Sequence, residues 1–427
     1  MLSTYTKFYL AERPGMSQRV DEMLETFTHL WWDCPTSPPE LGEEYSLRQQ
    51  IENEKLLDQQ VKVLENLLKH RPQGEADCLA ARQHLSSSFF EFTGTVFGYR
   101  PSQIAAIRNY SFEDILLEFA RQASGFDPGI STDDIYQAGR NLWSMNFVQI
   151  LLGLPVRMTP SLFAYSMLYP YTDNYLDNPA ISQEDKHRFY RSFRRRLSGE
   201  PVTPRDPLEE RIYDLVSMVE GEYDRSRYPH VYESLLAIHQ AQGRSVRLLQ
   251  GDLSPYEVDV LGICFEKGGT SVLADGYLVA GELTQPQQEL MFAYGTLTQL
   301  VDDLEDTQSD LEAGLMTVFS QTARHWKLDG VFARTLHFGN QAVQILTAGS
   351  PPDQKELMDV IRQSITPVLI LAAAGQQSYF NREFMAELQR HFPLRFSRLE
   401  KKRKHLLRYR REIDLLANAF IHPPTSL

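Results

Sequence analysis

Cysteine is scarce in this sequence, and its few copies lie far apart. The three cysteines, Cys34, Cys78 and Cys264, form no Cys-x-x-Cys pair and no Cys/His spacing. Such a set provides neither a disulfide framework nor a zinc site. A reducing cytosol is the simplest setting for it, and we therefore expect a cytoplasmic protein.

An excess of positive charge is also missing. The chain of 427 residues has a net charge of −13, whereas a general nucleic-acid binder needs a basic face that displaces counterions. Nucleic acid is therefore not an expected partner. Two segments, 187–197 and 398–411, are strongly basic. A solvated helix face is the usual reason for such segments, and contact with an anionic site or with a membrane surface is the alternative.

Long apolar runs are lacking as well. The two longest, FVQILLGLPV (147–156) and PVLILAAAG (367–375), are short for a bilayer span. Residues 1–22 contain no apolar core typical of a signal peptide. We expect a soluble protein that could still bind a lipid-like molecule and touch a membrane from the side.

Strand-like alternation is rare, and the dominant pattern is helical. Apolar residues recur at three- and four-residue spacing along most of the chain. The predicted helices span 17–31, 43–70, 76–97, 112–123, 132–152, 160–178, 183–197, 206–225, 230–250, 255–281, 285–310, 325–346, 353–380 and 394–418. No linker is long enough to force a split, so the sequence predicts a single all-α domain over residues 1–427.

The first of two acidic motifs ends the predicted helix 160–178. Its segment, SMLYPYTDNYLDNP (166–179), places Asp173 and Asp177 one turn apart on one helix face. Tyr169 and Tyr165 stand one and two turns before Asp173 on that face. The acids therefore follow an aromatic stripe.

The second motif, DDLEDTQSD (302–310), repeats this arrangement at the end of the predicted helix 285–310. Asp302 stacks with Asp306, while Asp303 lies on the same face as Asp306 and, a turn later, Asp310. These carboxylates repel one another and stand where the helix dipole disfavours negative charge. Mg²⁺ would relieve this repulsion, because it prefers oxygen ligands and commonly bridges carboxylates to substrate phosphates.

Tyr294 and Thr298 precede Asp302 as the two tyrosines precede Asp173. If the two helices face each other, they form a largely apolar pocket with a metal-binding rim. Such a pocket suits a molecule with a long hydrocarbon tail and a diphosphate head. A single DxxxD motif is most often a solvated helix face, but two such motifs on apolar helices favour the metal site.

With these two motifs the chain resembles the class I terpenoid synthase superfamily, and within it the bacterial large terpene synthases of the tetraprenyl-β-curcumene synthase type. Besides the acidic motifs, the likeness rests on the segments 228–250, 267–279 and 391–404. It covers residues 160–405, and we expect a catalytic core over 126–427. Residues 1–125 show no recognisable likeness. Asn174 and Asn178 stand where the familiar aspartate-rich motif has more acids, so the number of metal ions on that side stays open.

The resemblance implies a helical bundle with a central apolar cavity. It also implies a Mg²⁺-dependent carbon–oxygen lyase, with Mn²⁺ as an alternative ion, that ionises a linear isoprenyl diphosphate. The carbocation would then become a terpene hydrocarbon or alcohol. More than one metal ion would be held by Asp173, Asp177, Asp302, Asp303, Asp306 and Asp310. The substrate would contact Tyr165, Tyr169, Tyr294, Thr298, Arg244, Arg247 and Lys267.

Two glycines and one acid on the predicted helix 255–281 complete the candidates. Gly268 and Gly269 are expected either to break the helix beside the reacting carbons, a catalytic role, or to permit a tight helix crossing. Asp275 is an unexpected acid there and could face the cavity. Arg244 and Arg247 are cations that could clamp a diphosphate, although each one alone is more often a surface residue.

Two other functions stay open. A prenyl transferase or head-to-head (squalene- or phytoene-type) synthase shares the second motif but needs two isoprenyl substrates. A non-catalytic helical protein could use the same acids to bind a metal or a partner. Chain length, product skeleton and oligomeric state do not follow from the sequence.

Overall fold

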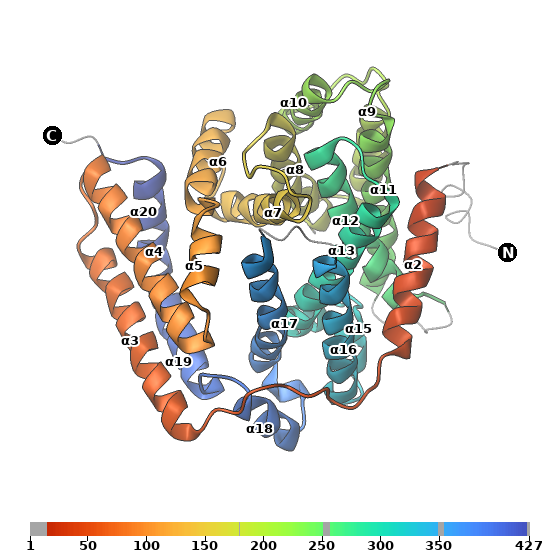
Figure 1. Ribbon diagram of the computed structural model, residues 1–427. Helices are drawn as coiled ribbons and strands as arrows, with labels where there is room; N and C mark the ends of the chain where they lie inside the picture. Colours follow the sequence, from red (N-terminus) through yellow and green to blue (C-terminus); the bar gives the residue numbers. More distant parts are fainter. Residues whose placement is uncertain (1–14, 179, 251–256, 349–353, 425–427) are drawn as a thin grey trace. The chain divides into compact units, whose positions relative to one another are not determined.

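The computed structural model describes residues 15–424 except 179, 251–256 and 349–353. Every regular element in these residues is a helix, so the all-α prediction is confirmed (Figure 1). The described residues form two compact units, each built from two separate stretches of the chain. Unit 1 contains the described residues up to Pro38 together with Tyr136–Ala348, and unit 2 contains Pro39–Ile135 and the described residues after Gly349. This division does not follow the core over 126–427 expected from the sequence.

Unit 1 contains both acidic motifs. Its helices are α2 (Met16–Asp33), most of α7 (Thr132–Leu151), α8 (Pro160–Asp177), α9 (Gln183–Leu197), α10 (Pro207–Glu222), α11 (Pro229–Ser245), α12 (Val260–Ala280), α13 (Gln285–Glu305), α14 (Thr307–Ala313), α15 (Val318–Ala323) and α16 (Asp329–Thr347), with a 3₁₀ turn over Val246–Gln250 after α11. The helix α12 is the centre of this unit. Nearly all its residues are buried, and it packs against α2, α8, α11 and α13 (Figure 1).

A glycine crossing brings α12 and α13 together. A Cβ atom added to Gly268 would lie 2.5 Å from the carbonyl oxygen of Gly295, and one added to Gly269 would lie 2.5 Å from the ring of Phe292. Both are far inside van der Waals contact, so only glycine permits this approach. The helix runs unbroken from Val260 to Ala280. The expectation of a helix break is therefore wrong, and the alternative of a close crossing is correct.

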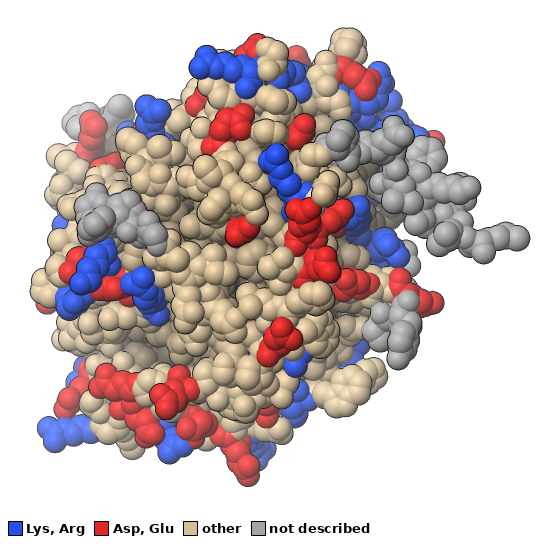
Figure 2. Space-filling model, turned by 45° about the vertical axis from the view of Figure 1, so that its right-hand side comes forward, with Lys and Arg blue, Asp and Glu red and all other residues tan. Residues whose placement is uncertain are grey.

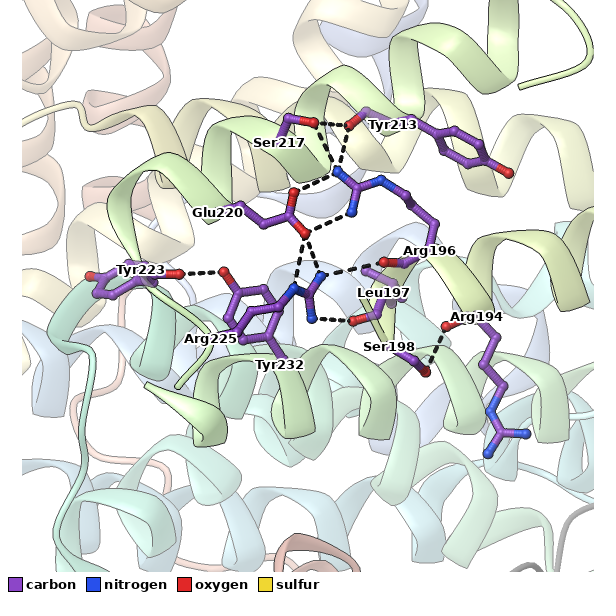
Figure 3. A network of polar contacts seen from close by, with 10 residues as sticks. All are labelled: Arg194, Arg196, Leu197, Ser198, Tyr213, Ser217, Glu220, Tyr223, Arg225 and Tyr232. Atoms are coloured by element: carbon purple, nitrogen blue, oxygen red, sulfur yellow. Dashed lines mark hydrogen bonds and ion pairs between the residues drawn. The ribbon is translucent and has the colours of Figure 1, made fainter. Parts of the chain in front are cut away.

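An arginine–glutamate network ties α9, α10 and α11 together (Figure 3). Glu220 on α10 pairs with Arg196 of α9 at 2.6 Å and with Arg225 at 2.7 Å. The guanidinium of Arg225 lies 3.8 Å from the ring centre of Tyr232 on α11, and the Tyr223 hydroxyl donates to a backbone carbonyl of α12. These partly buried, charge-assisted contacts fix the helices that flank α8 and α12.

Unit 2 is a second group of helices. They are α3 (Leu47–Lys69), α4 (Glu75–Phe97), α5 (Pro101–Arg108), α6 (Phe112–Phe126), α17 (Lys355–Gly375), α18 (Arg382–Arg390), α19 (Phe396–Leu406) and α20 (Arg410–Ile421), with short 3₁₀ turns over Gln377–Tyr379 and Leu407–Tyr409. The helices α3, α4 and α20 lie side by side (Figure 1). The bundle therefore joins residues from both ends of the sequence.

The basic segment 398–411 has acidic partners inside unit 2. Arg398 and Lys402 both pair with Asp58 of α3, at 2.5 and 2.7 Å, and His405 lies 2.5 Å from Glu65. Much of this positive charge is thus neutralised within the protein. Figure 2 shows several groups of charged side chains, in most of which acidic and basic residues adjoin, with uncharged surface between the groups.

The apolar run 367–375 forms the second half of α17. Among the described residues, this 21-residue helix alone is long and apolar enough to cross a membrane by length and composition. The run 367–375 by itself is too short to cross a membrane, but the helix that contains it begins at Lys355. Core helices of globular proteins pass the same test.

Candidate functional site

The first acidic motif lies at the end of α8. Thr159 caps the helix by accepting a hydrogen bond from the Leu162 amide at 3.4 Å, as its sequence predicts. The side chain of Asp173 accepts a hydrogen bond from the Gln242 amide of α11. Upstream, the rings of Tyr165 and Tyr169 meet edge to face with centroids 5.7 Å apart. The side chain of Asp177 lies outside the described residues.

The second motif is divided between two helices. The predicted helix 285–310 ends at Glu305, Asp306 is its C-cap, and α14 begins at Thr307. Asp302 forms an ion pair with Arg140 of α7, with 3.1 Å between Nη2 and Oδ1. Asp310 is buried on α14 and, with Asp306 and Asp302, belongs to one electrostatic cluster.

Asp303 is the most enclosed acid of this cluster. It is 4% exposed, and its Oδ1 accepts a hydrogen bond from Gln299 at 2.7 Å. The thiol of Cys264 on α12 is a second hydrogen-bond partner of this carboxyl group. Burial, followed by the carboxylates of Asp302 and Asp310, raises the pKa of Asp303 to about 7. Burial and the charges of Asp306 and Asp302 likewise raise the pKa of Asp310 to about 7. Near neutral pH these two acids gain from binding a proton or a cation.

A short stretch of α12 connects the two motifs. Cys264 and Lys267 lie beside the second motif, where Lys267 lowers and the surrounding acids raise the pKa of Asp310. Ser271 forms a hydrogen bond with the hydroxyl of Tyr169, which stands one turn before the first motif. Cys264 and Ser271 are seven residues apart, which is about 10 Å along a helix. The structure thus brings the two acidic helix ends to neighbouring levels of one helix.

Two predicted cations have other partners. Nη1 of Arg244 lies 2.8 Å from each carboxylate oxygen of Glu266, so this arginine joins α11 to α12. Its guanidinium group is therefore already paired within the protein. Arg247 lies on the exposed 3₁₀ turn after α11, 3.5 Å from the carbonyl oxygen of Glu257. Arg140 of α7, which no sequence motif indicates, instead pairs with Asp302 of the second acidic motif.

The two predicted substrate contacts before the second motif, Thr298 and Tyr294, have partners within the protein. The Thr298 hydroxyl donates to the carbonyls of Tyr294 and Gly295, at 3.1 and 3.0 Å, and so turns back onto its own helix. The ring of Tyr294 meets that of Phe147 on α7 edge to face, with 5.0 Å between centroids. This part of α13 faces an aromatic wall.

A small pocket lies between α8, α9 and α11. It contacts Tyr165, Tyr169, Asp173, His239 and Gln242, and its volume is about 30 Å³. This is room for one or two water molecules. Sites for small organic ligands usually have roughly 300–1,000 Å³. The pocket beside the predicted aromatic stripe is therefore much smaller than the cavity expected for an isoprenyl chain.

The acidic side chains that the structure describes offer the type of ligand atom that Mg²⁺ prefers, but they do not converge on one position. Among the described side chains, no three histidines, cysteines or acids converge closely enough to hold an ion. The donors are nevertheless all oxygen atoms, which Mg²⁺ prefers. Asp303 contributes a buried carboxyl group to a cluster whose mutual repulsion a cation would relieve.

Comparison with protein-family models, with curated protein sequences and with solved structures finds no match to this chain.

Proposed function

We propose that the protein is a class I terpene synthase that ionises a linear isoprenyl diphosphate in a Mg²⁺-dependent reaction. The observation that carries this proposal is the position of α12 between the two acidic helix ends. Its Cys264–Lys267 side adjoins Asp303 and Asp310, and its Ser271 side adjoins Tyr169, one turn from Asp173. A diphosphate beside this stretch of α12 could be reached from both acidic motifs.

In this proposal Asp302, Asp303, Asp306 and Asp310 hold metal on one side, and Asp173 and Asp177 hold it on the other. When bound, Mg²⁺ supplies Lewis-acid stabilisation of the charge that develops on the departing diphosphate. Lys267 and Arg140 add positive charge beside the second motif. The aromatic faces of Tyr165, Tyr169 and Tyr294 would stabilise an allylic cation through their quadrupoles.

The pocket volume favours a second candidate. A protein that binds a metal or a partner through its acidic clusters needs no cavity for a hydrocarbon chain. The pocket of about 30 Å³ beside Tyr165 and Tyr169 suits this function as it stands. The synthase requires those aromatic side chains to move apart when the substrate enters.

Turnover of single substrates tests the proposal. The purified protein is incubated separately with geranyl, farnesyl, geranylgeranyl and geranylfarnesyl diphosphate, with and without Mg²⁺. Products are read by gas chromatography–mass spectrometry beside a pyrophosphate assay. A Mg²⁺-dependent hydrocarbon or alcohol supports the synthase. Activity that appears only with isopentenyl diphosphate, or with two isoprenyl diphosphates, would instead indicate a coupling enzyme. Silence in all of these assays would favour the binding protein.

A matched pair of variants connects the activity to the site. Asp303→Asn removes the buried carboxylate of the second motif, and Glu305→Gln removes an exposed one two residues away. We expect Asp303→Asn to abolish product formation and Glu305→Gln to retain it. Equal losses in the two variants would mean that the acidic segment has only a general electrostatic effect.

A further inference from the structure

One face of α7 carries exposed aromatic side chains beside the second acidic motif. Four residues of unit 1 share this face at spacings of four, three and four residues, namely Tyr136, Arg140, Trp143 and Phe147. Tyr136 is 72% and Trp143 59% exposed, whereas the other α7 residues within 137–151, apart from Arg140, are buried or half-buried. The face therefore presents a large aromatic ring on each side of an arginine.

Two contacts align this face with α13. Arg140 pairs with Asp302 at 3.1 Å, and the ring of Phe147 meets that of Tyr294 with 5.0 Å between centroids. These contacts are seven residues apart on α7 and eight residues apart on α13, about 10 and 12 Å along the two helices. The helices therefore run antiparallel between the two contacts.

Trp143 lies between these two contacts. It stands one turn after Arg140 and one turn before Phe147, and Thr298 stands at the corresponding level of α13. Trp143 stays more than half exposed there, and Thr298 is half-buried. The helices thus leave an accessible surface between them. We call it the α7–α13 seam, and its residues are Arg140, Trp143, Phe147, Tyr294, Thr298 and Asp302.

We propose that the α7–α13 seam binds the hydrocarbon chain of an isoprenyl diphosphate and that Trp143 contacts this chain. The ligand class rests on the proposed function. The diphosphate would lie at the end of the seam formed by Asp302 and Arg140, and the chain would extend past Trp143 towards Tyr294. Tryptophan offers a flexible chain a large apolar surface and offers an allylic cation an aromatic face.

The tyrosines of α8 offer less room for such a chain. The pocket beside Tyr165 and Tyr169 has a volume of about 30 Å³, whereas sites for small organic ligands usually have roughly 300–1,000 Å³. The hydroxyl of Tyr169 is also joined to Ser271 of α12 by a hydrogen bond. Trp143, by contrast, is already accessible from the surface.

Tryptophan fluorescence tests the position of the chain without turnover. The probe is farnesyl thiodiphosphate with Mg²⁺, in which sulfur replaces the bridging oxygen and resists ionisation. It should quench the wild type, and Trp143→Phe should lose most of this change. Trp326→Phe is the control and should retain the quench, because Trp326 is 69% exposed but lies between α15 and α16. Inorganic pyrophosphate, which has no chain, should cause no quench.

Binding affinity, measured by isothermal titration calorimetry, gives a second readout. Trp143→Ala should weaken binding of the thiodiphosphate roughly tenfold or more, because the chain loses a large apolar contact. Tyr136→Ala is the matched control. Tyr136 is 72% exposed on the same face of α7 but lies on the other side of Arg140 from the seam, so this variant should bind like the wild type.

Three results would overturn the proposal: no quench of the wild type by any probe, a full quench that persists in Trp143→Phe, or equal losses of affinity in Trp143→Ala and Tyr136→Ala. If Trp143→Ala fails to fold, the comparison of Trp143→Phe with Trp326→Phe decides. Farnesol, used as a further probe, separates this proposal from the proposed function. A Trp143-dependent quench by farnesol without diphosphate turnover would retain the seam as a site for an apolar chain and remove the synthase. Turnover together with a quench that is independent of Trp143 would retain the synthase and remove the seam.

Discussion

Arg140 on α7 and Asp302 on α13 form an ion pair at the edge of the second acidic motif, with 3.1 Å between Nη2 and Oδ1. Both side chains are about half exposed, at 63% and 46%. The contact places a cation where the proposed function requires Mg²⁺. Under the proposed function, Arg140 would compete with the metal for Asp302 in the free protein.

Replacing Arg140 tests this competition. Exposed ion pairs are worth about 0.2–1 kcal/mol, so Arg140→Gln should increase the affinity for Mg²⁺ by a factor of roughly 1.4–5, measured by isothermal titration calorimetry. Arg410→Gln is the control, because Arg410 forms another exposed ion pair, with Asp133 in unit 2. An unchanged or weaker affinity in Arg140→Gln would place the metal away from Asp302.

Asp303→Asn should change the pH dependence of stability. The pKa of Asp303 is about 7 in the folded protein against 3.8 for an ordinary aspartate, so the folded state binds the proton more tightly. As the pH rises from about 4 through 7, ionisation of this buried carboxyl group therefore lowers the free energy of unfolding of the wild type. The variant avoids this cost. Its stability relative to the wild type should rise by a few kcal/mol between pH 5 and 8 without Mg²⁺, measured by urea unfolding. A difference that stays flat with pH would show that Asp303 is ionised throughout.

Gly295→Ala should weaken the packing of α12 on α13. The added methyl group would collide with the backbone of Gly268, and overpacking of this kind costs about 1–3 kcal/mol or more. Gly221→Ala is the matched control. Gly221 lies in α10 with nothing within 4 Å of the added atom, so alanine should stabilise the protein by about 0.4–1 kcal/mol. Chemical denaturation of both variants gives the comparison. Similar effects in the two variants would mean that the two helices can separate at little cost.

Glu220→Gln should destabilise the network between α9, α10 and α11. Glu220 is charge-paired with Arg196 and Arg225, and each charged hydrogen bond contributes about 1.5–3 kcal/mol. We expect a loss of about 2–4 kcal/mol at pH 7 after partial screening. Glu200→Gln breaks the more exposed pair with Arg195 and should cost less than about 1 kcal/mol.

The pH dependence of Glu220 gives a second readout. Its hydrogen bond with Arg196 holds its pKa below the ordinary value. The stabilisation is therefore complete above the pKa of the unfolded state and is lost as the pH falls through the lower folded pKa. The gap between wild type and Glu220→Gln should accordingly shrink in acid. A gap that is independent of pH would assign the loss to packing.

Local patterns predicted most of the helices, because apolar periodicity and capping residues such as Thr159 depend only on residues close together in the sequence. Three short helices, α5, α15 and α18, were missed, since six to nine residues give too little periodicity. The end of α13 at Glu305 was missed for another reason. Asp306 leaves helical geometry there, and no proline or glycine marks the position.

The candidate site could be predicted only where it depends on a single helix. The positions of Asp173 and Asp303 follow from helical spacing. The environment of Gly268 depends on Gly295, and the partner of Asp302 depends on Arg140, which lies 162 residues away in the sequence. Such contacts belong to the tertiary structure and leave no local signal. The pairing of Arg244 with Glu266 is likewise a tertiary contact, so the sequence alone predicts a ligand-binding arginine at this position.

The assembly of each unit from two distant stretches has a consequence for the nascent chain. The acidic side chains of α3 are translated well before their partners Arg395 and Arg398, which follow Glu54 and Asp58 by 341 and 340 residues. Domains commonly fold as they emerge, yet the first half of unit 2 must wait while residues 136–348 are translated. During that interval α3 and α4 lack the helices of the second stretch that complete unit 2.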